Sequence, residues 1–483
     1  METGVWISLA AYFLLMLAIG VYAWKKSTSN SEEYMLGGRD LSPSVAALSA
    51  GASDMSGWLL LGLPGALFVS GLSQSWIGIG LVIGAWLNWL IVAPRLRQQT
   101  EEYDNSLTIP GFLGNRFPSQ AVLLRIVSAV VIVVFFSVYT ASGLVGGGKL
   151  FASAFGGDYM TGVVITLGVV LVYTVMGGFL AVSLTDFVQG CIMMLALVIM
   201  PIVILTTQGG AGVDQAAARL TAIDPDYLSM FKGVTLLGWI SAMAWGLGYF
   251  GQPHIIVRFM AVRSVKDVPT ARRIGMSWMI VSLIGAIAVG IFGRAYAERT
   301  GLQVTDPETI FIMLSDLLFH PLVTGFLYAA LLAAIMSTVS SQLLVASSSL
   351  TEDIYLTVFK RNATERELVN VGRLAVLAVG AVAVLLASNP NSEILGLVAN
   401  AWAGFGAAFG PLIILALTWK RMTGAGAVAG LVTGAVVVIL WIALGLSSTI
   451  YEIVPGFIAS WIAIVVVSLN TPDRGEYRAP KAG

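Results

Sequence analysis

Long apolar runs recur along the whole chain, and no other feature limits its fold as strongly. Each run holds about 20 residues or more, the length that a helix needs to cross a hydrocarbon core of about 30 Å. Only 11% of all residues are charged, whereas a soluble domain carries about 25%. Backbone polar groups inside a bilayer must bond within their own segment, which favours helices. The sequence therefore predicts an all-α membrane protein with about 13 transmembrane helices, over residues 5–24, 42–70, 73–93, 121–152, 159–178, 183–207, 234–257, 274–297, 322–350, 368–387, 394–418, 424–446 and 451–469.

The charges around the first run indicate how the chain is oriented. Glu2 is the only charged residue before Val5–Trp24, and Lys25 and Lys26 follow directly. A cleaved signal peptide has its positive charges first, so we expect a retained helix with its N-terminus outside. Thirteen crossings then put the C-terminus inside, and 21 of the 26 basic residues fall inside, as the positive-inside rule requires. The five basic residues left outside are Lys149, Arg219, Lys232, Arg294 and Arg299.

Two of the thirteen segments contain helix breakers. The second carries Gly51, Gly57 and Pro64, and the seventh carries a run of glycines followed by Pro253. Paired interruptions in two inverted halves point to a binding site near the bilayer midplane. The alternative is that glycine and proline are simply common in membrane helices. We expect one transporter domain, 1–483, made of a leading helix (5–24), inverted repeats of helices 2–6 (42–207) and 7–11 (234–418), two trailing helices (424–469) and an inner tail (470–483).

Asp54 is a carboxylate within the second apolar run, close to Ser49, Ser53 and Ser56. A charge at bilayer depth costs on the order of 3 kcal/mol on insertion scales, so such residues usually serve an ion, a proton or a fixed positive charge. The alternative is that the carboxylate caps amides at the helix break, and both roles are compatible. We predict that Asp54 takes part in handling a cation.

The ninth segment places Ser337 and Thr338 side by side, with Ser340 and Ser341 following. Hard cations prefer several oxygen ligands, and hydroxyls together with freed carbonyls supply them without a full charge. The alternative, hydroxyls bonded back to their own helix, is common. The residues alone leave these two readings open.

Aromatic side chains gather at the two breaks, where they suit a small, partly apolar solute. These residues are Trp58, Tyr139, Trp245 and Tyr249. Ordinary packing or an interfacial belt is the alternative for each one singly. Asp186 and Arg258 fall near the inner ends of helices six and seven. We expect Arg258 to be an anchor at the membrane interface. For Asp186 two roles remain open, a part in a gate or ion exit path and an anchor at the interface.

Several classes of protein are excluded by composition. A single cysteine, Cys191, makes no internal disulfide, and two histidines, His254 and His320, leave little for a metal cluster or a catalytic triad. The net charge is zero, which implies no nucleic-acid partner. We therefore expect no enzyme, and no obligatory protein partner is evident beyond the lipid bilayer.

Five stretches of the sequence closely resemble the sodium/solute symporter family. They read ALSAGASDMSGWLLLGLPGA, GGFLAVSLTDFVQ, WGLGYFGQPHIIVRFMA, AAIMSTVSSQLL and NAWAGFGAAFGP. The resemblance runs from the first helix to the thirteenth, and the motifs are long. It implies the leucine-transporter-type fold. Gln74 departs from the pattern, because an acidic residue is expected at that position.

The resemblance also implies roles for individual residues. The Na+ ligands would be the carbonyls of Ala52, Met55 and Ala334 with the hydroxyls of Ser337 and Thr338. Asp54 and Ser56 would be needed for the use of Na+, and Asp186 would lie on the inward ion path. The substrate pocket would be formed by Trp58, Tyr139, Trp245, Tyr249 and Pro253.

The function that the resemblance implies is Na+-coupled uptake of L-proline by alternating access in a bacterial inner membrane, with Li+ as a candidate substitute ion. One alternative keeps the fold and changes the solute to another amino or carboxylic acid. Another is a transporter-like solute sensor, which we do not expect because only a short tail follows the last helix.

Overall fold

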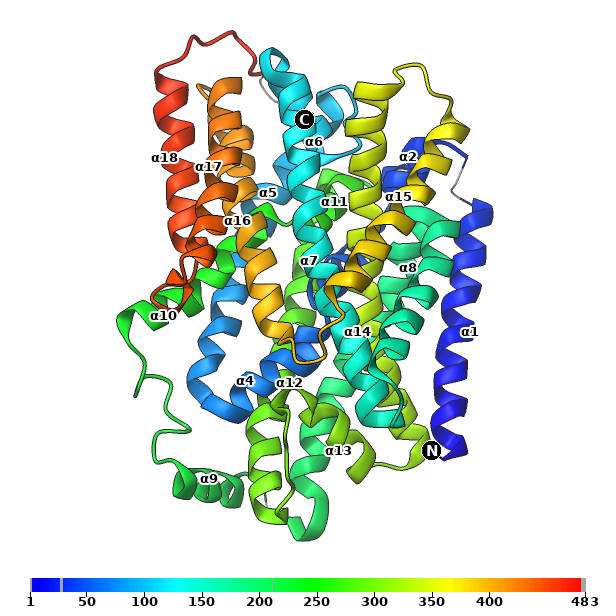
Figure 1. Ribbon diagram of the computed structural model, residues 1–483, viewed down its shortest axis with the longest axis vertical. Coiled ribbons are helices and arrows are strands. Elements are labelled where there is room, and N and C mark those ends of the chain that lie inside the picture. The colour runs from blue at the N-terminus through cyan, green and yellow to red at the C-terminus, as the bar shows by residue number, and fades with distance from the viewer. Residues whose placement is uncertain (1, 27–28, 211, 479–483) are drawn as a thin grey trace.

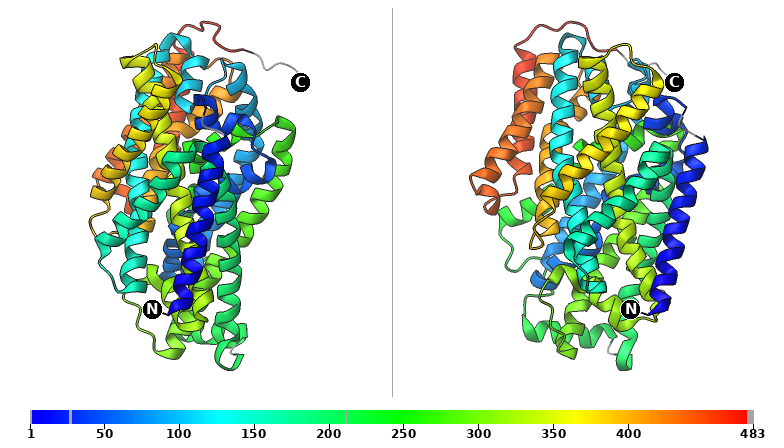
Figure 2. Two further views of the ribbon diagram at one scale, coloured as in Figure 1. Left: turned by 90° about the vertical axis from the view of Figure 1, so that its right-hand side faces the viewer. Right: turned by 45° about the vertical axis from the view of Figure 1, so that its right-hand side comes forward.

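The structure is a computed structural model that describes residues 2–26, 29–210 and 212–478. Its long helices lie side by side along one axis, and the first residues of α1 and the last residues of α18 lie at opposite ends of the bundle (Figures 1 and 2). The long helices are α1 (Thr3–Lys26), α5 (Ser75–Glu102), α7 (Ala121–Phe155), α8 (Tyr159–Gly210), α12 (Val268–Thr300), α14 (Pro321–Ser348), α15 (Glu365–Leu386), α16 (Ile394–Thr418), α17 (Gly424–Ala443) and α18 (Ile453–Leu469).

Within the described ranges, nine helices are long and apolar enough to cross a membrane, or ten if the bent second segment counts as one span. Apolar side chains cover the outside of the bundle, as a lipid-facing surface requires. The chain is therefore an all-helical, multi-pass membrane protein. The sequence did not predict four short helices in the connections: α2 (Ser31–Leu36), α6 (Ile109–Arg116), α9 (Gly212–Ile223) and α13 (Ile310–Leu318).

Helix α8 is twice as long as a bilayer is thick, and it reverses direction at Gly178. That glycine has a φ of +60°, which lies in the left-handed region. Before the glycine, Tyr173 packs against Gly20 of α1; beyond it, the Gln189 amide donates to the Tyr12 hydroxyl at 2.9 Å. The chain thus returns along α1, and α8 consists of two antiparallel arms that match the separate segments 159–178 and 183–207.

The second segment breaks where the sequence places Asp54, Met55 and Ser56. Helix α3 (Pro43–Asp54) ends there, and the chain resumes as the π-helical turn η2 (Trp58–Gly62) and α4 (Leu63–Ser70), with a bend of 59°. The Met55 backbone has φ −81° and ψ 83°, which no longer continues the helix. The break therefore frees main-chain groups in the middle of the bundle.

The seventh segment breaks in a different way. Helix α10 (Leu236–Met243) tightens into the 3-10 segment η5 (Ala244–Gly251), and α11 (Pro253–Ala261) starts at the proline. Glycines allow η5 to lie directly on α5, because a Cβ on Gly84 would overlap the Gly246 carbonyl oxygen. This close backbone contact holds the second break against α5.

Other helix ends differ from the expected ones by several residues. The main difference is α5, which continues through Pro94 to Glu102 rather than ending at 93. The extra turns are held by Arg97, whose Nε donates to the Val262 carbonyl at 2.5 Å. A contact so distant in sequence leaves no local signal. Helix α14 likewise continues beyond 350 as a π-helical segment, η8 (Ser349–Phe359).

Candidate ion and substrate site

Four of the five predicted Na+ ligands converge where the end of α3 meets the middle of α14. The Ser337 hydroxyl donates to the carbonyl of Ala52 at 2.7 Å and is 3.1 Å from that of Ala334. The Thr338 hydroxyl lies 3.4 Å from both carbonyls. Met55, the fifth, is buried at the break itself. Because a hydroxyl can turn its hydrogen away, this cluster offers several neutral oxygens to a hard cation.

Asp54 joins the broken helix to three aromatic side chains of the predicted substrate pocket. Its Oδ2 accepts a hydrogen bond from the Tyr249 hydroxyl. Its main-chain carbonyl accepts from the Trp58 indole at 3.2 Å and lies 3.5 Å from the Tyr139 hydroxyl. All four residues are buried. The residue predicted to handle the ion is therefore one hydrogen bond away from residues predicted to hold the solute.

Ser56 shapes the turn between α3 and η2. Its hydroxyl accepts from the Trp58 amide at 3.3 Å, and its own amide donates to the Asp54 carbonyl at 3.0 Å. Such local bonds substitute for the interrupted helix ladder. In this arrangement Ser56 stabilises the backbone conformation of the break.

Trp245 and Pro253 lie at the two ends of η5 and have different surroundings. The Trp245 ring stacks on Tyr451, with ring centroids 5.2 Å apart, and lines a cavity of about 390 Å³ together with Gln74 and Trp76. Pro253 is buried at the start of α11. The preceding residue is Gln252, whose side-chain amide donates to the carbonyls of Gly248 and Trp402, each at 3.0 Å. Trp245 thus faces the cavity, whereas Tyr249 faces Asp54.

Sequence reasoning missed two aromatic partners of this region. Tyr451 precedes α18 and donates its hydroxyl to the Ala399 carbonyl at 2.6 Å. Trp402 of α16 donates to the Trp245 carbonyl at 2.7 Å and meets the Tyr249 ring edge-on. Trp402 lies in the motif NAWAGFGAAFGP, which was the only available signal; Tyr451 had none.

The expected interfacial position of Arg258 is wrong. Its side chain is fully buried and pairs with Asp186 at 3.1 Å between Nη2 and Oδ2. Arg258 Nη2 also donates to Ser341 at 2.7 Å and its Nε to Ser49 at 3.0 Å, while Ser49 donates to Asp186 at 2.7 Å. The guanidinium stays buried because its charge is neutralised and its donors are bonded. The cluster ties together α3, α8, α11 and α14.

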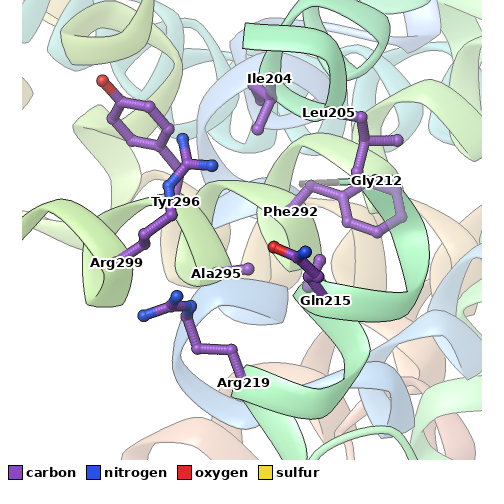
Figure 3. A pocket seen from close by; sticks show the side chains of 10 residues that line it. Ile204, Leu205, Gly212, Gln215, Arg219, Phe292, Ala295, Tyr296 and Arg299 are labelled. Carbon is purple, nitrogen blue, oxygen red and sulfur yellow. The ribbon is translucent and has the colours of Figure 1, made fainter. Parts of the chain in front are cut away.

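A further small cavity, of about 20 Å³, lies between α8, α9 and α12, near the end of the bundle that carries the N-terminus (Figures 1 and 3). Arg219, Tyr296 and Phe292 are among its lining side chains. It contains none of the predicted ion or substrate residues, so it belongs to the helix packing around α9.

Comparison with known proteins agrees with this architecture. A sequence model of the sodium:solute symporter family matches residues 34–434. The chain belongs to this family. Membership of a symporter family makes it a transporter and not an enzyme, with Na+ as the indicated coupling ion.

Several known bacterial proteins are similar to this chain over nearly its whole length. The high-affinity proline transporter PutP of Bacillus subtilis is 60% identical over 94% of this chain and 96% of its own length. The osmoregulated proline transporter OpuE of the same species is 56% identical over 99% and 97%. The sodium/proline symporter of Staphylococcus aureus is 53% identical over 98% and 94%.

Solved structures share the fold at much lower identity. A Na+-coupled sialic acid symporter in a substrate-bound outward-open state superposes with a TM-score of 0.82, at 20% identity and over 98% of each chain. The nucleobase-cation symporter Mhp1 in a closed conformation reaches a TM-score of 0.57 at 14% identity, over 93% of this chain and 97% of its own. The helices of this family member are therefore arranged as in leucine-transporter-like Na+ symporters.

Proposed function

We propose that this chain takes up L-proline together with Na+ across a bacterial inner membrane by alternating access. The observation that supports this most strongly is the identity of 53–60%, over nearly the whole chain, with bacterial transporters named for proline. The site is compatible with that solute. It joins a cluster of neutral oxygens to buried aromatic rings, which suit a small zwitterion with an apolar ring.

In this proposal Na+ binds to the carbonyls of Ala52, Met55 and Ala334 and the hydroxyls of Ser337 and Thr338. Asp54 attracts the ion and Ser56 maintains the break, while Asp186 borders the inward path. Proline binds among the aromatic residues of the two breaks. The proposed substrate residues are Trp58, Tyr139, Trp245, Tyr249 and Pro253.

We also propose thirteen crossings in one domain, with the N-terminus outside and helices 2–6 and 7–11 as inverted repeats. The two arms of α8 count as two of these crossings. The opposite positions of the start of α1 and the end of α18 agree with an odd number. The charge distribution supports the orientation, because the thirteen-helix count assigns 21 of the 26 basic residues to the inner side.

Proline is a zwitterion, so one Na+ per proline moves one net charge. The membrane potential then supplies about 2.3 kcal/mol per 100 mV. Since a tenfold ratio corresponds to about 1.4 kcal/mol, a potential of about 100 mV alone supports roughly 40-fold accumulation.

The test is uptake of labelled proline into proteoliposomes that contain the purified chain. An inward Na+ gradient should drive accumulation, an inside-negative potential should increase it, and Li+ in place of Na+ tests the substitute ion. Uptake that is indifferent to Na+, Li+ and potential would refute the coupling. Unlabelled competitors in tenfold excess test the substrate. If another amino or carboxylic acid inhibits uptake of labelled proline more strongly than unlabelled proline does, proline is not the preferred solute.

A further inference from the structure

A cavity of about 390 Å³ lies where four long segments of the chain begin. Its lining residues come from the turn before α5, from α10, from the first turns of α16 and from the residue before α18. In the proposed topology these are crossings 3, 7, 11 and 13, and every odd-numbered crossing begins outside. The cavity therefore belongs to the outer side of the transporter, and its volume is within the range of about 300–1,000 Å³ that ligand pockets have.

Charge distinguishes this cavity from two others of comparable size. One of about 370 Å³ is lined by Glu32, Asp104 and Arg125 among others, and one of about 580 Å³ by Lys149 and Asp306 among others. The lining residues of the 390 Å³ cavity include no charged side chain. Because a neutral wall does not concentrate ions, we expect a ligand of this cavity to carry no net charge.

Three aromatic rings line the cavity. Trp245 and Tyr451 stack there with ring centroids 5.2 Å apart, and Trp76 adds the third ring. Their polar atoms are already bonded: the Trp76 indole donates to the Met230 carbonyl at 2.8 Å and the Tyr451 hydroxyl to the Ala399 carbonyl at 2.6 Å. The rings are thus held in place and offer apolar surface, which suits an apolar ring on the ligand.

Gln74 supplies a polar group that is available to a ligand. Its side-chain amide forms no hydrogen bond with the residues that the structure describes. The hydroxyls of Ser73 and Ser241, by contrast, donate to the carbonyls of Ser70 and Leu237 in their own segments. An amide both donates and accepts, so Gln74 can bind either the carboxylate or the ammonium group of an amino acid without carrying a charge itself.

Trp245 lies between the cavity and the residues around Asp54. Its carbonyl accepts from the Trp402 indole at 2.7 Å, and the Trp402 ring meets that of Tyr249 edge-on, with centroids 4.9 Å apart. A Cβ on Gly248 would overlap the Trp402 indole nitrogen, so this ring packs directly on η5. A solute in the cavity is therefore still separated from Asp54 by aromatic side chains.

We propose that the cavity is an entrance subsite, where an amino acid with an apolar ring and no net charge docks before it reaches the residues around Asp54. Trp245 and Tyr451 contact its ring, and Gln74 binds one of its polar groups. Tyr451 precedes α18, so the two trailing helices take part in the solute path although they lie outside the proposed repeats. The proposal rests on the uptake of proline proposed above.

The experiment measures how L-proline protects a cysteine in the cavity from a charged, membrane-impermeant methanethiosulfonate reagent. Cys191→Ser first removes the single cysteine of the chain. Ser73→Cys then places a thiol in the lining, and Val234→Cys gives a second reporter. The full-length chain is kept in Na+-free buffer, so that the proposed Na+ site stays empty. At ten times its dissociation constant, L-proline should slow the reaction about tenfold, because only about one chain in ten remains without ligand.

Thr305→Cys is the matched control reporter, because it lies in the charged outer cavity of about 580 Å³. We expect L-proline to leave its reaction rate unchanged. If L-proline slows the reaction at Ser73→Cys and Val234→Cys no more than at Thr305→Cys, the cavity is not a proline site.

Substitutions in the lining test the residues assigned to the subsite. Gln74→Ala and Tyr451→Ala should each raise the L-proline concentration for half-protection about fivefold, the effect of losing one hydrogen bond or one ring contact. Tyr451→Phe keeps the ring and should protect nearly as well as the unmodified residue. Tyr159→Ala is the control, because its hydroxyl also donates to a carbonyl, that of Ala387 at 2.8 Å, outside this cavity.

Elution on size-exclusion chromatography establishes that each variant is folded. If Gln74→Ala or Tyr451→Ala shifts half-protection no more than Tyr159→Ala does, the proposed subsite is wrong. Na+-driven uptake without protection would refute the subsite alone. Protection without Na+-driven uptake would support the subsite and refute the coupling proposed above.

Discussion

The buried pair of Asp186 and Arg258 makes a quantitative prediction about stability. Both side chains are fully buried, and their 3.1 Å contact joins α8 to α11. Arg258→Gln leaves Asp186 buried without a counter-charge, although Ser49 still donates to it, and Asp186→Asn leaves the guanidinium buried without a counter-charge. Removing one partner of such a pair costs about 3–5 kcal/mol.

The double variant distinguishes a charge effect from lost packing. Asp186→Asn combined with Arg258→Gln removes both charges and retains side chains of similar size. We expect it to recover most of the loss, so that it is only about 1–2 kcal/mol less stable than the unmodified chain, because a neutral pair escapes the desolvation of two ions. The two single losses should therefore not add.

The assay is heat inactivation in detergent, followed by the fraction of chain that elutes as a monodisperse peak. Membrane proteins unfold irreversibly under these conditions, so the half-life at a fixed temperature is the quantity to compare. Both single variants should lose their peak faster than the double variant. A double variant that is less stable than either single one would refute the reasoning.

Three further predictions concern the site and its packing. Asp54→Cys should abolish Na+-driven proline uptake while the chain remains folded in the membrane; near-normal uptake would count against an ionic role. Ser337→Ala with Thr338→Ala should raise the Na+ concentration for half-maximal uptake about tenfold or more, and a change confined to the KM for proline would show that the ion site is misplaced. Gly84→Ala should destabilise the chain by about 3 kcal/mol or more, because its Cβ would overlap the backbone of η5. Gly168→Ala, on an exposed face of α8 with no atom within 4 Å, is its control and should be nearly neutral.

Local chemistry explains why the two breaks could be predicted. Gly51, Gly57 and Pro253 weaken a helix wherever they stand, and the structure breaks both segments close to them. The meeting of Ser337 with the Ala52 carbonyl is different, because 285 residues separate the two in sequence. The family resemblance predicted that contact, whereas the residues alone left open whether the hydroxyls simply bond to their own helix.

Other features that depend on distant partners could not be predicted. Arg258 near the end of an apolar run is typical of an interfacial anchor. Its burial depends on distant partners such as Asp186, 72 residues earlier. Asn88 is an ordinary polar residue in an apolar helix until the Tyr249 carbonyl is placed beside it. The reversal of α8 at Gly178 was predicted only in part, as two separate segments.

Tyr249 suggests how ion and solute are coupled. Its hydroxyl bonds to Asp54 on the first break, its carbonyl accepts from Asn88, and its ring meets Trp402. A Na+ ion near Asp54 therefore changes the electrostatic environment of a residue whose ring belongs to the proposed proline pocket. A ligand shifts a conformational equilibrium only by its differential affinity for the two states. If the two breaks separate as the transporter opens inward, the Tyr249–Asp54 bond exists in one state alone, and Na+ and proline would then favour that state together.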